Sequence, residues 1–327
     1  GTKGVPTAEL ELRGTKARLV GEPGRGVPVI ATLFNITRIH NAISAVSYMR
    51  RATAVARDYA YRRTAAGQLL SNNPLHLATL AEMESEFRGA LLMLFDSVRW
   101  LGESEASKDA DTRQRAALSL RLATPLLKLF TGKQAVAVTS EGIEALGAHG
   151  YMEDSGVPRL LRDAQVLPIW EGTTNVLALD VLRVASRHPD AVPQFLADAE
   201  RRAGDGDVDG QLAAARRVIL DSLQHMAQQK DGTGIYIARH IAYAMSAHYV
   251  AALSLEHATR TGLASDRTSA NRWLNIRLAE QIHALQQARA DDVQALRSLA
   301  LDLDQSGQPR HSDGKNVDAR GVPRPRL

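Results

Sequence analysis

The sequence predicts a mainly α-helical protein built around a bundle of long helices. Hydrophobic residues make up 44% of the 327 positions and aromatic residues only 5%. This composition, in which Ala and Leu dominate the apolar positions, favours closely packed helices over a β-sandwich, which uses more Val, Ile, Tyr and Phe. A second observation is the three- and four-residue spacing of apolar side chains over long stretches without Gly or Pro.

The composition also excludes several functional classes. The chain has no cysteine, so disulfides, thiolate metal sites and cysteine nucleophiles are excluded. Forty basic and 36 acidic residues give a net charge of +4, which permits an anionic ligand without requiring one. No apolar run approaches the ~20 residues of a membrane span, so no such span is expected. Residues 1–13 lack the pattern of a signal peptide.

The first 30 residues differ from the rest of the chain. Polar and apolar residues alternate at 8–12, a turn is expected at Arg13–Gly14, and a second apolar stretch follows at 17–20. This pattern predicts one or two short strands, and such strands need a sheet that is supplied elsewhere.

Three long helices and a shorter one, joined by loops, are predicted for residues 31–187, which indicates a four-helix bundle. Proline is tolerated in the first helical turn, so Asn73–Pro74 marks a helix start, whereas Pro125 is expected to bend a helix. Residues 102–111 are expected to form a polar loop, and Thr173 or Thr174 to cap the last helix of the bundle. The helices are expected at about 30–66, 73–101, 112–146 and 174–186, with a turn or short helix at 158–164.

His188–Pro189 separates this bundle from an additional helical region at 190–304. Alternation of three aspartates with glycines at 204–210 is reminiscent of a calcium loop, but the Glu at its twelfth position is missing, so a polar hinge is the preferred interpretation. Residues 305–327 have little apolar content and are expected to be disordered. The helices of the additional region are expected at about 191–203, 208–230, 234–262, 268–289 and 291–304.

Two arginines on the first helix are candidate anion ligands. Arg38 and Arg63 lie 25 positions apart (63 minus 38), which places them on nearly the same helix face, roughly 37 Å apart. They suit two separate anionic groups or one long ligand plus a second. From spacing alone, two solvated surface arginines remain the simpler interpretation.

Glu171 is a candidate general base. It follows a largely apolar run and lies in a turn just before a helix, with Gly172 allowing close approach of a ligand to the backbone. Apolar neighbours raise the pKa of a carboxyl group while a helix N-terminus lowers it, so a poised carboxylate is one interpretation. The other is a surface glutamate that favours the helix dipole.

Five segments, in matching order and spacing, resemble the acyl-CoA dehydrogenase family over about residues 1–187. The phrase Trp-Glu-Gly-Thr and the helical region after residue 190 look most like the adaptive-response branch, which is linked to DNA alkylation damage. The five segments are 1–30, similar to the end of the family's middle β-domain; 34–38, similar to the start of its first long C-terminal helix; 63–67, similar to Arg-x-x-Phe-Gly; 144–151, similar to Gln-x-x-Gly-Gly-x-Gly-Phe/Tyr; and 162–173, similar to the catalytic Arg-Asp…Tyr-Glu-Gly-Thr signature.

The resemblance implies FAD-dependent α,β-dehydrogenation of an acyl-CoA. Glu171 would abstract the α-proton while the β-hydride passes to the flavin, and its backbone N–H would help to hold the thioester carbonyl. Thr37 stands where another branch of the family places its base, so Glu171 is the single base candidate. No metal is implied.

The resemblance also implies the binding residues. Asn35, Arg38, Trp170 and Gly172 would contact the substrate. FAD would lie at a subunit interface, which implies a homodimer or homotetramer. An electron-transfer flavoprotein or another acceptor would reoxidise it, in the cytoplasm or the mitochondrial matrix. The cofactor-binding residues would be Arg63, Glu144, Gly147 and Ala148 towards a neighbouring subunit's FAD, with Thr173 and Asn175 at their own site.

The sequence departs from the family pattern at four positions. Ala66 replaces Phe, Glu144 replaces Gln and Ala148 replaces the second Gly, and these three changes weaken the expected FAD site. Trp170 replaces Tyr in the acyl-site wall. The family's N-terminal helical domain and most of its β-domain would precede Gly1, so we expect this chain to be a fragment that is inactive alone.

The alternative hypothesis is a DNA-associated flavoprotein with vestigial turnover. A solvated basic surface is the simpler interpretation of its basic residues, and a purely structural helical bundle is a third possibility. The basic residues are Arg267, Arg272, Arg277 and Arg289 in one helical stretch, and Arg310, Lys315, Arg320, Arg324 and Arg326 near the end of the chain.

Overall fold

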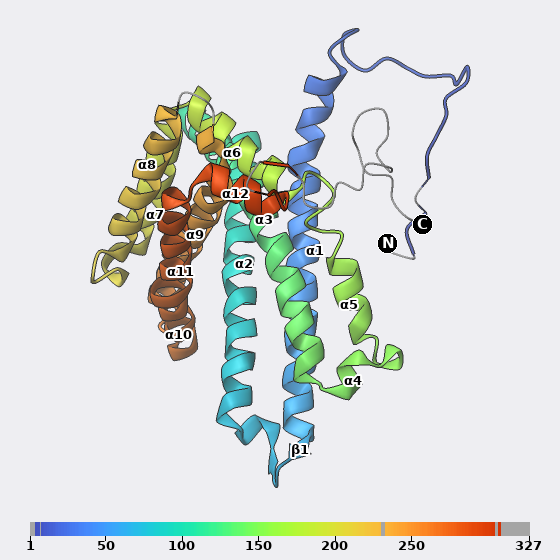
Figure 1. Ribbon diagram of the computed structural model, residues 1–327, viewed down its shortest axis with the longest axis vertical. Coiled ribbons are helices and arrows are strands. Elements are labelled where there is room, and N and C mark those ends of the chain that lie inside the picture. Colours follow the sequence, from blue (N-terminus) through green and yellow to red (C-terminus); the bar gives the residue numbers. More distant parts are fainter. Residues whose placement is uncertain (1–3, 7, 230–232, 305–306, 309–327) are drawn as a thin grey trace.

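A computed structural model describes residues 4–6, 8–229, 233–304 and 307–308 (Figure 1). These residues are mostly helical, so the predicted mainly α fold class is confirmed. Among them, no helix combines the length and apolar character needed to cross a bilayer. The stretch expected to be disordered lies, apart from 307–308, outside the described residues.

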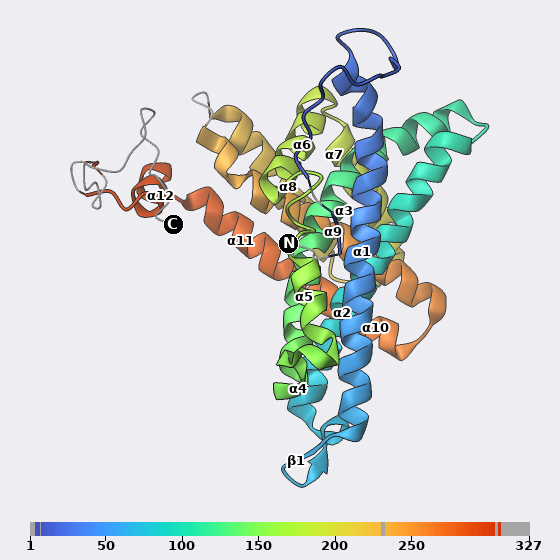
Figure 2. The same ribbon diagram turned by 90° about the vertical axis from the view of Figure 1, so that its right-hand side faces the viewer.

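Three long helices form the bundle and run side by side along its length (Figures 1 and 2). They are α1 (Gly26–Arg62), α2 (Pro74–Ala106) and α3 (Ala110–Ala145). Helix α3 packs against both α1 and α2, and it also contacts the short helix α5 (Val157–Ala164) and α6 (Thr174–Arg187). The central position of α3 lets it approach the segment that joins α5 to α6.

Side-chain caps explain where two of these helices begin. The Asn73 side chain accepts hydrogen bonds from the backbone N–H groups of Leu75 and His76, at 3.0 and 3.3 Å, so the predicted start of α2 is confirmed. Asp109 caps α3 by accepting from the Thr112 N–H at 2.9 Å. The predicted loop at 102–111 is wrong in extent, because α2 continues to Ala106 and a single capping residue suffices to start α3.

The predicted strands at the N-terminus are not formed. The described residues among the first 25 contain no strand, because no neighbouring sheet completes the hydrogen bonding that a strand needs. The only sheet among the described residues is a hairpin of β1 (Thr64–Ala65) and β2 (Gln68–Leu69). Its turn uses Ala66 and Gly67, both with positive φ, as a two-residue hairpin requires. The first helix therefore ends at Arg62, earlier than predicted.

The second region contains six α-helices among the described residues. Helix α9 is buried along most of its length and packs on α2, α3 and α6, so it joins the two regions. A π-helical segment, η5 (Trp273–Leu278), interrupts the single helix predicted at 268–289. Helices α11 and α12 extend away from the bundle (Figure 2). The six helices are α7 (Ala191–Ala203), α8 (Gln211–Gln228), α9 (Ala238–Thr261), α10 (Ala264–Arg272), α11 (Ala279–Ala290) and α12 (Val293–Ala300).

The polar segment at 204–210 prepares the start of α8. Both carboxylate oxygens of Asp207 accept backbone hydrogen bonds, from the N–H groups of Gln211 and Leu212 at 2.8 and 3.0 Å. Asp207 thereby satisfies two of the free donors at the helix N-terminus. This contact gives one aspartate of the segment a structural role in the predicted hinge.

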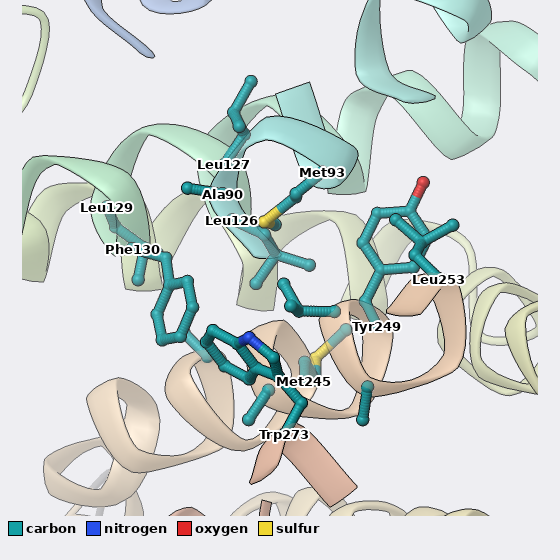
Figure 3. Close-up of a cluster of buried hydrophobic side chains, with 14 of the residues drawn as sticks. Ala90, Met93, Leu126, Leu127, Leu129, Phe130, Met245, Tyr249, Leu253 and Trp273 are labelled. Atoms are coloured by element: carbon teal, nitrogen blue, oxygen red, sulfur yellow. The ribbon is translucent and has the colours of Figure 1, made fainter. Parts of the chain in front are cut away.

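Trp273 fixes the junction between the two regions. Its side chain is fully buried beside Phe130 and Met245 (Figure 3), and its Nε1 donates to the Ser85 carbonyl oxygen at 2.9 Å. The indole lies directly against Gly89 of α2, where an added Cβ would come within 2.5 Å of the ring. A glycine at this position is therefore what lets α2 approach the π-helical segment.

We predict that Gly89→Ala lowers the free energy of unfolding by about 1–3 kcal/mol, because the new methyl overlaps the buried indole. Gly102→Ala in the same helix is the matched control. Nothing lies within 4 Å of a Cβ at that position, and alanine favours a helix over glycine by up to ~1 kcal/mol. Chemical denaturation of both variants measures the difference, and a Gly89→Ala variant as stable as the Gly102→Ala variant would contradict the close packing of Trp273 on α2.

Candidate active site

Glu171 lies in a conformationally demanding turn immediately before α6. Its φ is +58°, and the following Gly172 has a φ of +101°. A positive φ is uncommon for a residue with a side chain and costs on the order of 1–3 kcal/mol. A backbone conformation of this kind persists only where surrounding contacts stabilise it. The contacts made by this turn therefore show how the fold keeps Glu171 at a positive φ.

Three side chains from two helices hold the turn. Thr37 Oγ1 donates to Glu171 Oε2 at 2.7 Å, and Arg38 Nε donates to the Glu171 carbonyl oxygen at 3.2 Å. Lys128 Nζ donates to the Gly172 carbonyl oxygen at 2.6 Å. The carboxylate and two successive carbonyls of the turn are thus all fixed, the first two from α1 and the third from α3.

Arg38 also forms an ion pair that joins α1 to α6. Its Nη2 lies 2.8 Å from Asp180 Oδ2, and only 14% of the Arg38 side chain is exposed. Asp180 accepts a second hydrogen bond from Arg183, whose side chain is 58% exposed. Two nitrogens of the Arg38 guanidinium therefore hold the Glu171 turn and α6 in place. The third nitrogen, Nη1, takes part in neither of these contacts.

Lys128 is the residue of this site that sequence reasoning missed. Its side chain is completely buried within α3. Burial, and then the charge of Arg38, lower its pKa to about 8, while Glu171 opposes the change. A signal was present in the sequence, because Lys128 interrupts the apolar run Leu126-Leu127-Lys128-Leu129-Phe130. A lysine placed there must be paired or bonded when the helix is buried.

An open cavity of about 550 Å³ lies beside the Arg38–Asp180 ion pair and is lined by both Asn35 and Arg38. The structure therefore brings these two predicted substrate residues together near Glu171. Trp170 is 44% exposed, and Thr173 and Asn175 are also exposed at the start of α6. The other side chains lining the cavity include four basic ones, Arg121, Arg183, Arg187 and His188.

The remaining predicted cofactor residues lie at the opposite end of the bundle. Arg63 follows the last residue of α1, beside the β1–β2 hairpin, and the short helix α4 (Ala148–Tyr151) lies at the same end (Figure 1). The Tyr59 and His149 rings meet edge to face with centroids 6.0 Å apart, which ties α4 to the end of α1. Within one chain, the structure does not bring Arg63, Glu144, Gly147 and Ala148 to Glu171.

Two family models match most of the chain. Residues 24–186 match the acyl-CoA dehydrogenase C-terminal domain, and residues 191–301 match a domain described as acyl-CoA dehydrogenase 11 C-terminal domain-like. The chain therefore belongs to the acyl-CoA dehydrogenase family. Its second helical region is of the kind found in acyl-CoA dehydrogenase 11.

Individual relatives agree with this assignment. Acyl-CoA dehydrogenase family member 11 of Caenorhabditis elegans is 47% identical over 276 residues, covering 81% of this chain and 44% of that protein. The putative acyl-CoA dehydrogenase AidB of Escherichia coli is 34% identical over 188 residues, covering 57% of this chain and 33% of that protein. This chain thus spans less than half of either relative.

A solved structure shows the same fold. C. elegans ACDH-11 in complex with C11-CoA superposes with a TM-score of 0.74 at 41% identity, covering 86% of this chain and 49% of that chain. A second structure, the apo-form of Bd2924, superposes with a TM-score of 0.65 at 37% identity, covering 77% of this chain and 46% of that chain. The similarity therefore extends through both helical regions.

We predict that Arg38→Ala destabilises the chain by about 2–4 kcal/mol, because it leaves the half-buried Asp180 with less compensation and frees the Glu171 carbonyl. Arg183→Ala is the control, since it removes the more exposed partner of the same carboxylate and should cost no more than ~1 kcal/mol. Urea unfolding monitored by circular dichroism compares the two. Similar losses for both variants would contradict a structural role for the Arg38 contacts.

Proposed function

We propose that this chain is the base-carrying, C-terminal part of an FAD-dependent acyl-CoA dehydrogenase, an oxidoreductase acting on CH–CH bonds. The observation that carries the proposal is the placement of the Glu171 carboxylate. It is held by the Thr37 hydroxyl at 2.7 Å on a turn with positive φ, next to a cavity lined by Asn35 and Arg38. Strain maintained by several long-range contacts is typical of a functional site.

In this proposal Glu171 removes the α-proton of the acyl thioester. The left-handed turn positions the carboxylate, and Thr37 orients one of its oxygens by hydrogen bonding, so the other oxygen can take the proton. Gly172 lets the acyl chain approach the backbone closely, and Trp170 forms part of the wall. Bound FAD would supply the acceptor for the β-hydride.

The exposed residues at the start of α6 fit a bound flavin. The Thr173 side chain does not cap α6, so it leaves the backbone N–H groups of the first helical turn open to a hydrogen bond with a ligand. At the other end of the bundle, Gly147 has a φ of +59° and nothing within 4 Å of an added Cβ, which leaves its backbone open to approach. Arg63 is exposed at the same end and would supply positive charge to a pyrophosphate.

The separation of these two groups supports a cofactor shared between subunits. Arg38 lies on α1 and Arg63 directly follows its last residue, so the two are roughly 37 Å apart, for 25 residues at 1.5 Å each. One FAD-binding site therefore takes Thr173 and Asn175 from one chain and Arg63, Glu144, Gly147 and Ala148 from another. This arrangement requires a homodimer or a homotetramer.

Exposed apolar side chains on the first turns of α1 support the proposal that further parts of the protein complete the active site. These turns project beyond the rest of the bundle (Figures 1 and 2). Val27, Leu33 and Phe34 are 76%, 45% and 39% exposed. A preceding β-domain and N-terminal helical domain would cover this surface and the flavin, as the family resemblance implies.

An acyl-CoA is the proposed substrate class. The complex of C. elegans ACDH-11 with C11-CoA supports this choice, since that structure resembles this chain over both helical regions. We propose an electron-transfer flavoprotein or another acceptor as the partner that reoxidises the flavin. The cytoplasm or the mitochondrial matrix remains the proposed location.

The DNA-associated alternative has less support. The similarity to E. coli AidB is consistent with the adaptive-response branch. However, Arg277 pairs with Glu86 at 2.6 Å and with Glu280 at 2.8 Å, so it does not present a free charge to a phosphate. The basic residues from Arg310 onwards lie outside the described residues.

We predict that Glu171→Gln in the full-length gene product lowers the rate of flavin reduction by about 10³-fold under anaerobic acyl-CoA, because the isosteric amide cannot accept the proton. The variant should retain FAD and still shift the flavin spectrum when acyl-CoA binds. Stopped-flow absorbance measures both. Reduction at the wild-type rate would exclude Glu171 as the base, and a wild type that holds FAD without reduction by any acyl-CoA would favour vestigial turnover.

We predict that Arg63→Ala releases FAD during gel filtration while wild type retains it, because a charge-assisted contact to pyrophosphate contributes about 1.5–3 kcal/mol. Arg62→Ala is the matched control, since the neighbouring Arg62 is exposed and already pairs with Asp58 at 2.7 Å. Flavin-to-protein absorbance ratios report the outcome. Equal ratios for the two variants would show that Arg63 is only a surface residue.

A further inference from the structure

We propose that Lys128 is a positioning residue that holds Glu171 in its catalytic conformation by tethering the Gly172 carbonyl to the central helix. The proposal rests on the role of Glu171 as the base. Lys128 does not touch the carboxylate. It acts on the backbone of the turn that carries it.

The first observation is the geometry of a completely buried lysine. Lys128 Nζ donates to the Gly172 carbonyl oxygen at 2.6 Å, and the side chain has no exposed surface. A buried ammonium group is retained only where it is paired or bonded, because its loss of hydration is otherwise uncompensated. Within the described structure, the Gly172 carbonyl is the hydrogen-bond partner that makes the burial of the Lys128 side chain possible.

The second observation is the way the segment before Glu171 docks on α3. Gly132 lies four residues after Lys128, on the same helix face. A Cβ added to Gly132 would come within 3.3 Å of the Leu167 carbonyl carbon and the Pro168 nitrogen. From α1, Asn41 Nδ2 donates to the Leu167 carbonyl oxygen at 3.2 Å. The segment therefore contacts α3 at Gly132 and again, one helical turn away, at Lys128.

These two contacts explain how the turn keeps its positive φ. The segment is anchored at Leu167 on one side of Glu171, and its Gly172 carbonyl is anchored on the other side. A return of Glu171 to an ordinary φ would rotate this carbonyl away from the ammonium group and carry the carboxylate away from Thr37. The hydrogen bond from Lys128 thus attaches the turn to the rigid helix α3 and fixes the position of the base.

The charges around Lys128 are consistent with a hydrogen-bond tether. Arg38 from α1 and Glu171 from the turn are the charged groups that act on it, and Arg38 is itself paired with Asp180 of α6. The guanidinium of Arg38 disfavours a second positive charge on Lys128. An ion pair alone therefore does not explain why a lysine is buried at this position. A neutral amine also donates N–H, so the tether does not require the proton.

The test compares amide exchange and flavin reduction in the full-length gene product. Lys128→Met keeps an unbranched apolar side chain that fills most of the space of the lysine stem, and it removes the donor. We expect the backbone amides of Ile169 and Trp170, which bond to the Val166 carbonyl at 2.9 and 3.2 Å, to exchange at least ~10-fold faster than in wild type. We expect flavin reduction to fall by about 10²-fold, the loss produced by a misplacement of 1 Å, with acyl-CoA affinity unchanged within about threefold.

Thr131→Val is the matched control for disturbing α3. Thr131 is also fully buried, but its hydroxyl donates within the helix, to Leu127 O at 2.8 Å. This variant should leave exchange at 169–170 and flavin reduction near wild-type values. If Lys128→Met fails to fold, Lys128→Gln replaces it, because its shorter side chain retains polarity but draws the donor back from Gly172, and the same losses are expected.

The two proposals fail in different ways. Wild-type exchange at 169–170 in a folded Lys128 variant would overturn the tether, whatever the enzyme does. Faster exchange spread equally over α2 and α9 would also overturn it, because Lys128 would then contribute only global stability. Conversely, a wild type without flavin reduction, combined with local exchange that depends on Lys128, would retain the tether of the turn and reject the proposed dehydrogenation.

Discussion

The burial of the middle of α3, residues 122–132, on all sides is the constraint on which the rest of the structure depends. Its apolar side chains face α1, α2, α6 and α9, and a stretch of helix that is apolar all round must be enclosed. Buried polar side chains on this helix are stabilised where they find a hydrogen-bond partner. Thr131 and Thr139 bond within the helix, to the Leu127 and Ala135 carbonyls. Lys128 is too long for this solution and reaches the Gly172 carbonyl instead, so the core of the bundle and the candidate active site are one connected structure.

The second helical region is oriented by buried charges as well as by apolar packing. Asp96 of α2 accepts hydrogen bonds from Arg202 of α7 and from Tyr249 of α9. Burial raises the pKa of Asp96, but the hydrogen bonds from Arg202 and Arg99 outweigh it, and the net pKa is lowered. This contribution to stability is present above the usual carboxyl pKa and is lost as the pH falls through the lowered value. An apolar contact would tolerate sliding of α9 along α2, whereas these directional bonds do not.

The sequence predicted the elements better than it predicted the contacts between them. The helix start at Asn73 follows from local capping, which a sequence contains directly. The start of α6 after Thr173 was also predicted, but the expected side-chain cap is not formed there. The strands among the first 30 residues were predicted wrongly because alternation alone does not supply a sheet. The π-helical interruption at Trp273 was missed because it depends on space left by Gly89, 184 positions earlier (273 minus 89). Glu171 was identified through its motif, but its bonds to Thr37 and Arg38 join residues more than 130 positions apart, and periodicity contains no information at that distance.

The two ends of α1 differ in how well their charges suit the proposed ligands. Around Glu171, each charged group is compensated, with Arg38 on Asp180 and Lys128 on a carbonyl. At the other end, burial and then the neighbouring Glu144 and Glu82 raise the pKa of Glu141. These neighbouring carboxylates would repel a pyrophosphate. The exposed Arg63 is the counter-charge that the same end offers. In the proposed oligomer, cofactor affinity thus depends on whether one guanidinium outweighs this acidic group, whereas the geometry of the base does not depend on that balance.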